Sequence, residues 1–260
     1  MIDSQGPEAW YMGLPRFTRT FITIILGITL LSFFKVLDPS KLLLNWELVL
    51  QKFQIWRLVT SVLYVGPFSL RWIFFILLFS QFSSSLENNS VFTHSPGAYL
   101  YFLFIQSIFL ACISAGFFWP SGYPYLADSL LFAIIYYWSK RDMWTIVSIY
   151  FFNVKAYQLP FALLFLHLVM GSSLWVDIMG MISGHLFYLA REVLPSKGYT
   201  NFLIRTPKVF DLLATSIDRM YSQLFRRSTH LGGSRFRYDP RPPEPTGRMF
   251  IGRGIRLGDS

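Results

Sequence analysis

Residues 98–118 read AYLYFLFIQSIFLACISAGFF, and this stretch decides the class of fold. It contains no charged side chain. A helix that crosses a bilayer needs about 20 mostly apolar residues, so the stretch predicts a transmembrane helix. Further apolar runs lie on both sides of it, at residues 17–37, 70–86, 123–138, 159–170 and 174–194. The sequence therefore predicts an all-α polytopic membrane protein with six spans and both termini on one side.

The composition agrees with a membrane protein. Hydrophobic residues make up 53% of the 260-residue chain and charged residues only 14%, whereas soluble domains carry about 25% charge. The net charge of +9 lies mostly near the end, because residues 191–260 hold thirteen Lys or Arg against six Asp or Glu. No groove-reading motif accompanies these basic residues, which favours a lipid bilayer surface and argues against nucleic acid as a partner.

Nothing in the sequence points to a cofactor or a metal. The single cysteine, Cys112, cannot form an internal disulfide, and no Cys/His cluster has zinc-ligand spacing. The first ten residues are acidic and polar, and no small-residue cleavage site follows the first apolar run. That run is therefore expected to remain as a signal anchor behind a short N-terminal segment, residues 1–16.

The segment between the first two predicted spans is different in character. Residues 42–65 mix Asn, Glu, Gln, Lys and Arg with Leu, Trp and Phe, so we expect an interfacial loop rather than a further span. Apart from this loop, Lys and Arg near the ends of the predicted spans are more frequent on the side that holds the termini. Such an excess of Lys and Arg marks the cytosolic side. Both termini are thus predicted to be cytosolic. In this orientation the Asn88 sequon would face the cytosol and stay unglycosylated.

The segment after the last predicted span has three parts. Residues 196–227 form a predicted cytosolic amphipathic segment, with Thr206-Pro207 as a plausible helix start. Its apolar face would rest either on an anionic leaflet or on the protein's own loops, and both possibilities stay open. Residues 228–260 are rich in Gly, Pro, Arg and Ser and predict a disordered tail. The tail ends in a glycine-hinged, basic and apolar peptide.

The sequence suggests one enzymatic function that can be tested, which is intramembrane serine proteolysis. The sixth predicted span contains Gly180 and Gly184, four residues apart and suited to close helix packing, followed by His185. A histidine base would need a serine on another helix, and Ser129 on the fourth span is the candidate. No glycine flanks Ser129 to provide an oxyanion site. We therefore expect no catalytic residues, with the Ser129–His185 protease as the alternative.

Polar side chains gather on the second and third predicted spans. Ser80, Gln81 and Ser84 lie on the second span and Gln106 on the third. Polar groups in a membrane span are functional candidates, because lipid cannot satisfy their hydrogen bonds. They predict either a wet substrate path through the bundle or hydrogen-bonded helix packing, and the pattern alone does not separate the two.

Several motifs together resemble the derlins, rhomboid-related pseudoproteases of the endoplasmic reticulum. The similar segments are Phe53–Arg57 in the interfacial loop, Lys155–Pro160 before the fifth span, Gly180–Tyr188 in the sixth, and Asn201–Pro207 after it. The resemblance implies a rhomboid-like six-helix bundle over residues 17–195 without the Gly-x-Ser-Gly nucleophile motif. In that bundle Trp56 and Arg57 would brace the loop, and His185 would belong to the sixth-helix motif.

The resemblance also implies a function and partners. Derlins assist retrotranslocation of misfolded proteins from the endoplasmic reticulum membrane, beside a membrane-bound ubiquitin ligase complex and with possible homo-oligomers. Some end in the motif Phe-x-Gly-x-Gly-x-x-apolar, which binds the AAA unfoldase valosin-containing protein. Here the motif falls on Phe250, Gly252, Gly254 and Leu257. A pure membrane tether for the unfoldase, with an inert bundle, is a further alternative.

Overall fold

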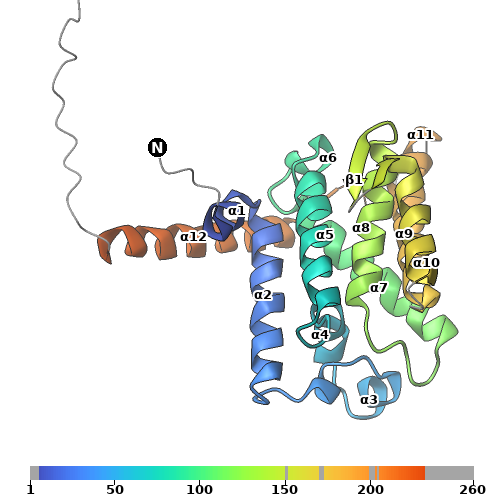
Figure 1. Ribbon diagram of the computed structural model, residues 1–260, viewed down its shortest axis with the longest axis horizontal. Helices are drawn as coiled ribbons and strands as arrows, with labels where there is room; N and C mark the ends of the chain where they lie inside the picture. Colours follow the sequence, from blue (N-terminus) through green and yellow to red (C-terminus); the bar gives the residue numbers. More distant parts are fainter. Residues whose placement is uncertain (1–5, 150–151, 170–172, 199–202, 204, 232–260) are drawn as a thin grey trace, which may run out of the picture. The chain divides into compact units, whose positions relative to one another are not determined.

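A computed structural model describes residues 6–149, 152–169, 173–198, 203 and 205–231 of the chain (Figure 1). Each of the six stretches predicted to span the membrane contains one principal helix. These helices are α2 (Arg16–Phe33), α5 (Leu70–Glu87), α7 (Ala98–Phe117), α8 (Ala127–Arg141), α9 (Leu159–Val169) and α10 (Leu174–Tyr188). Two of them, α2 and α7, are long and apolar enough to cross a membrane by length and composition. The fold is therefore mostly helical, with membrane-protein character.

Shorter elements connect these helices. They are α1 (Pro7–Gly13), η1 (Pro39–Lys41), α3 (Trp46–Gln51), α4 (Trp56–Leu63), α6 (Ser90–Thr93), η2 (Ala156–Gln158), the π-helical η3 (Leu189–Val193) and α11 (Leu194–Ser196). The interfacial loop predicted between the first two spans therefore contains two short helices, α3 and α4. Helix α10 continues through η3 and α11, so the sixth stretch is helical as far as Ser196.

The prediction of an entirely helical chain is wrong at one place. Strands β1 (Ile146–Ile149) and β2 (Phe152–Lys155) form an antiparallel hairpin in which Ile146 pairs with Lys155. Val147 is buried whereas its neighbours Ile146 and Ser148 are exposed, which is the two-residue period of a strand. This apolar run is too short to cross a bilayer, and strand pairing satisfies its backbone groups instead.

Helix α8 is the centre of the core. All its side chains from Ser129 to Ser139 are buried, and it contacts α5, α7, α9 and α10. Figure 1 shows α8 between α5 and the α9–α10 pair. Such a helix has no face left for lipid, which explains why the fourth stretch has little amphipathic character.

A carboxylate fastens α2 to α5. The Glu87 carboxylate accepts hydrogen bonds from the backbone N–H groups of Phe17 and Thr18, at 3.0 and 2.9 Å, and from the Thr18 hydroxyl at 2.8 Å. The first N–H groups of a helix have no partner within the helix. Glu87 supplies partners for two of them and places a negative charge at the positive end of the helix dipole.

The amphipathic segment after the bundle forms α12 (Lys208–Leu231). The helix begins directly after Thr206-Pro207, but the predicted hydroxyl cap is not made within the described residues, where the buried Thr206 hydroxyl has no partner. Helix α12 includes residues 228–231, and no glycine or proline occurs between Lys208 and Leu231. Residues up to Met220 form one compact unit, and every contact described below lies within it.

Candidate functional site: a polar groove along α5

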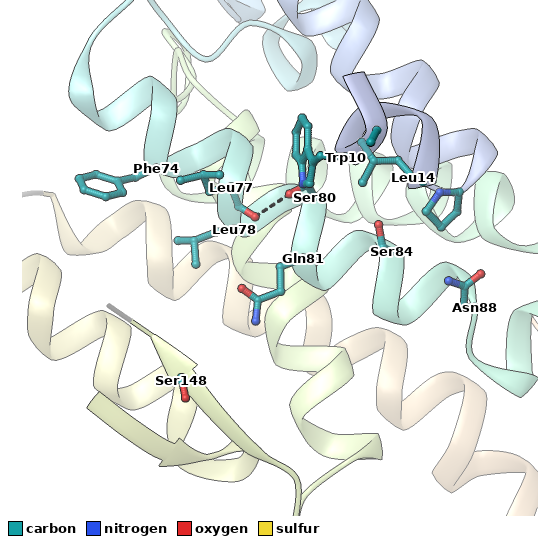
Figure 2. A pocket seen from close by; sticks show the side chains of 13 residues that line it. Trp10, Leu14, Phe74, Leu77, Leu78, Ser80, Gln81, Ser84, Asn88 and Ser148 are labelled. Atoms are coloured by element: carbon teal, nitrogen blue, oxygen red, sulfur yellow. Dashed lines mark hydrogen bonds between the residues drawn. The ribbon is translucent and has the colours of Figure 1, made fainter. Parts of the chain in front are cut away.

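A groove of about 630 Å³ follows the C-terminal half of α5. Helix α5 contributes six of the thirteen lining residues, and the others come from α1, the turn that follows α1, Asn88 directly after α5, and β1. The lining residues are Ala9, Trp10, Gly13, Leu14, Pro15, Phe74, Leu77, Leu78, Ser80, Gln81, Ser84, Asn88 and Ser148. Figure 2 shows the polar residues of α5 along one wall and Trp10 and Leu14 beside them. The groove thus combines a polar stripe with apolar rims.

The polar residues of α5 fall on two different faces. Ser83 shares hydrogen bonds with the Thr18 hydroxyl and the Tyr99 hydroxyl, both at 2.7 Å, and so joins α2, α5 and α7. Ser80, Gln81 and Ser84 face the groove instead. Helix packing therefore accounts for Ser83, whereas Ser80, Gln81 and Ser84 lie on the face of α5 that lines the groove.

The groove residues differ in how well their hydrogen bonds are satisfied. Ser80 is buried and donates to the Leu77 carbonyl at 2.8 Å, whereas Gln81 is exposed. The Ser84 hydroxyl is a buried atom without a hydrogen-bond partner in the described part of the chain. A buried, unsatisfied hydroxyl costs free energy, so Ser84 offers a hydrogen bond to whatever enters the groove.

Gln106 does not line the groove with the other predicted path residues. It is completely buried on α7, and its side-chain carbonyl accepts a hydrogen bond from Ser183 on α10. This bond joins two helices, because a polar pair across a helix interface satisfies groups that lipid cannot. The buried amide nitrogen of Gln106 has no hydrogen-bond partner among the described residues. The extension of the substrate path to Gln106 is not supported by its position.

Arg57 organises the interfacial loop. Its guanidinium is 5% exposed and donates to the Gln54 side chain at 2.6 Å and to the carbonyls of Ser40 and Leu43 at 2.7 and 2.6 Å. These bonds join the start of α4 to the segment before α3. Trp56, the preceding residue, is 53% exposed and contributes an apolar surface rather than a buried contact.

Gly180 and Gly184 lie where α10 touches α8. A Cβ atom on Gly180 would come within 2.4 Å of the Ser129 carbonyl oxygen, and one on Gly184 within 2.8 Å of the Ala133 carbonyl oxygen. Only a residue without a side chain fits such an approach. The two glycines therefore set the distance between the helices.

Ser129 and His185 do not form a catalytic pair. The Ser129 hydroxyl donates to the Val176 carbonyl at 2.8 Å, and His185 is exposed and hydrogen-bonded to the Tyr136 hydroxyl at 2.9 Å. Ser129 and Tyr136, the α8 residue that His185 contacts, are seven residues apart, which is about 10 Å along a helix. A general base must reach within hydrogen-bonding distance of its nucleophile, and this arrangement does not provide that.

A charged cluster lies at the opposite end of α8, and sequence reasoning missed most of it. Asp128 pairs with Arg71, and the buried Asp177 accepts a bond from His167 at 3.0 Å. His167 is a polar residue in the otherwise apolar α9, and its partner Asp177 lies on α10. No group of three His, Cys, Asp or Glu within the described ranges is arranged to hold a metal ion.

Trp10, Asn88 and Ser148 also line the groove, and no pattern in the sequence connects them with Gln81. The predicted unfoldase-binding residues Phe250, Gly252, Gly254 and Leu257 lie outside the described residues.

The fold and the groove define a mostly helical membrane protein. Comparison with known proteins gives the family: residues 14–208 match the Der1-like family, and the chain belongs to it. It is 32% identical over 199 residues to Derlin-2.1 of Zea mays, covering 74% of this chain and 80% of that relative. It is 33% identical over 200 residues to Derlin-2.2 of Arabidopsis thaliana, covering 74% and 82%. Derlin-1 of Arabidopsis thaliana is 32% identical over 205 residues, covering 78% and 75%.

Membership in this family has two consequences. The family is rhomboid-like and catalytically inactive, which agrees with the separation of Ser129 from His185. Its function is related to the degradation of proteins from the endoplasmic reticulum. The groove along α5 is therefore considered as a binding surface rather than as an active site.

Proposed function

We propose that this protein resides in the endoplasmic reticulum membrane and assists retrotranslocation of misfolded proteins along the α5 groove. Helices α2, α5, α7, α8, α9 and α10 are its six spans, and both termini are cytosolic. Arg141 on α8 pairs with Glu192 in η3, and Arg191 donates to the Val91 carbonyl ahead of α7, so these basic residues share one end of the bundle. Positive residues mark the cytosolic side, which supports this orientation.

A short span supports a thinned bilayer beside α9. Helix α9 has 11 residues, or about 16 Å at 1.5 Å per residue. A typical hydrocarbon core is about 30 Å thick, so lipid beside this helix would thin to match it. A thinner bilayer lowers the cost of moving a polar chain across it.

The single observation that carries the proposal is the Ser84 hydroxyl, buried and unpartnered beside the exposed amide of Gln81. These groups give an extended polypeptide hydrogen-bond partners at a depth where lipid offers none. The apolar rim formed by Trp10 and Leu14 accommodates hydrophobic side chains of the same substrate.

The route is tested by changing the polarity of one face of α5. Replacing Gln81 and Ser84 by leucine should slow the degradation of a misfolded reporter in cells that depend on this chain. Ser85→Leu is the matched control, because Ser85 neighbours Ser84 but does not line the groove. Unchanged degradation in the double variant, with the tail intact, would refute the route and favour the tether function.

Energy for extraction comes from the AAA unfoldase valosin-containing protein, recruited by the terminal motif. Phe250 and Leu257 serve as apolar anchors, and the glycines let the backbone approach its partner closely. Leu257→Ala should weaken binding of the unfoldase to the full-length protein, with Ile255→Ala as control because Ile255 occupies a variable motif position. Equal binding by both variants would refute this assignment. A membrane-bound ubiquitin ligase complex and further copies of the chain complete the proposed assembly.

A further inference from the structure

Helix α12 uses one face to dock on the bundle. The Phe210 ring lies 5.1 Å from the Tyr101 ring and 5.2 Å from the Phe104 ring of α7, measured between centroids. Asp211 accepts hydrogen bonds from the Ser95 hydroxyl and, at 2.9 Å, from the Gly97 backbone N–H. The first turn of α12 is therefore fixed beside the N-terminal end of α7.

A second anchor lies two turns further along α12. Asp218 forms an ion pair with Arg16, the first residue of α2. Asp211 and Asp218 are seven residues apart and thus on the same face of α12. The two anchors make this part of α12 run across the ends of α7 and α2, and Figure 1 shows it crossing α2 rather than following it.

The contacts of Phe210 set the depth of α12. Tyr101 and Phe104 lie three and six residues inside α7, which begins at Ala98. At 1.5 Å per residue this is about 4.5 and 9 Å below the end of the span. Amphipathic helices in a membrane interface bury their apolar face about 5–10 Å into the headgroup and acyl boundary. The start of α12 therefore lies at membrane depth.

A second apolar face of α12 is not covered by any of the residues that the structure describes. Val209, Leu212, Leu213 and Met220 are 63%, 66%, 48% and 51% exposed. Their spacing of three, one and seven residues places them within an arc of about 100°, whose centre lies about 100° from Phe210 and nearly opposite Asp211. Lys208 and Arg219 are exposed and lie along the edge of this face.

We propose that the face formed by Val209, Leu212, Leu213 and Met220 inserts into the bilayer leaflet on the side of the chain's termini and prefers anionic headgroups. Lipid is the occupant because the contacts of Phe210 place the helix start at interface depth. Basic residues at the edge of the face complement negative headgroups, and each is worth about fivefold in membrane partitioning. The net positive charge of residues 191–260 adds to the attraction.

Fluorescence quenching in the full-length protein tests this assignment. Cys112 is the only cysteine, so a Cys112→Ser background allows one new label at a time. An environment-sensitive dye is attached at Leu212→Cys on the proposed lipid face, or at Thr215→Cys, which lies about 60° from Leu212 and about 120° from the centre of that face, as the matched control. Both variants are reconstituted in phosphatidylcholine vesicles with and without phosphatidylserine.

We expect doxyl-labelled lipid to quench the dye at position 212 about threefold or more beyond the dye at 215, and phosphatidylserine to increase the difference. Equal quenching at the two positions would overturn the proposal. A dye at 212 that is shielded both from aqueous iodide and from doxyl lipid would also overturn it, because a protein surface would then cover the face. No effect of phosphatidylserine would overturn the preference for anionic lipid.

Discussion

Replacing Gly180 by alanine changes the tightest contact between α8 and α10. The new Cβ would stand 2.4 Å from the Ser129 carbonyl oxygen and 2.5 Å from the Phe132 Cβ, whereas ordinary van der Waals contact begins at 3.4 Å. The atoms in the way belong to the backbone and to a Cβ, so a rotamer change cannot relieve the clash. We expect the two helices to separate by roughly 1 Å at this crossing.

The cost follows from three contributions. Overpacking a well-packed core costs about 1–3 kcal/mol. The separation also breaks the 2.8 Å hydrogen bond from Ser129 to the Val176 carbonyl at the same crossing, for about 1 kcal/mol more. The higher helix propensity of alanine offsets up to about 1 kcal/mol of this destabilisation. The net destabilisation of Gly180→Ala is therefore about 1–3 kcal/mol.

Thermal unfolding of the purified protein in lipid nanodiscs, followed by tryptophan fluorescence, measures this effect. We expect the Tm of Gly180→Ala to fall by about 3–10 °C. Gly184→Ala should cost less, because its closest atom is 2.8 Å away. Gly116→Ala, where nothing lies within 4 Å of the new Cβ, should be neutral or stabilising. A Gly180→Ala variant as stable as Gly116→Ala would refute the argument from close approach.

Three further predictions concern other parts of the protein. Arg57→Ala should destabilise the interfacial loop by about 2–4 kcal/mol, because two backbone carbonyls and a glutamine side chain lose a charged donor. Faster amide exchange over residues 38–56 would reveal it, and unchanged exchange would contradict it. Gly97→Ala should release α12, since the new Cβ would lie 2.4 Å from the α12 backbone. Trypsin should then cleave within α12 faster than in the parent, and an equal rate would argue against docking at this glycine. Ser129→Ala and His185→Ala should leave degradation of a misfolded reporter unchanged, and loss of substrate cleavage in either variant would restore the protease hypothesis.

The apolar runs predict the long helices well because bilayer thickness and helix rise leave few alternatives. The third stretch was predicted at 98–118 and forms α7 from Ala98 to Phe117. The hairpin was not predicted because a four-residue strand is too short to show a clear alternation of apolar and polar residues. The stability of each strand also depends on hydrogen bonds to the backbone of the other. Within the part of the chain that the structure describes, length and composition alone identify α2 and α7 as spans. The shorter helices depend on packing around α8.

The groove was predictable in part. Ser80, Gln81 and Ser84 stand out because polar residues are rare in membrane helices. Gln106 has the same signal but pairs with Ser183, 77 residues later in the chain. Which polar residue faces a groove and which faces a neighbouring helix depends on the rotation of each helix. A single sequence contains no direct information on that rotation.

The hydrogen bonds between Glu87 and the first residues of α2 affect how the chain assembles during its synthesis. Helix α2 is synthesised 54 residues before the end of α5, so it enters the bilayer with its first N–H groups unpaired. When α5 follows, the Glu87 carboxylate accepts hydrogen bonds from those N–H groups, and the carboxylate and the N–H groups gain their partners in one step. The first two spans can therefore associate as a self-contained pair, which gives the later helices a preformed wall to assemble against.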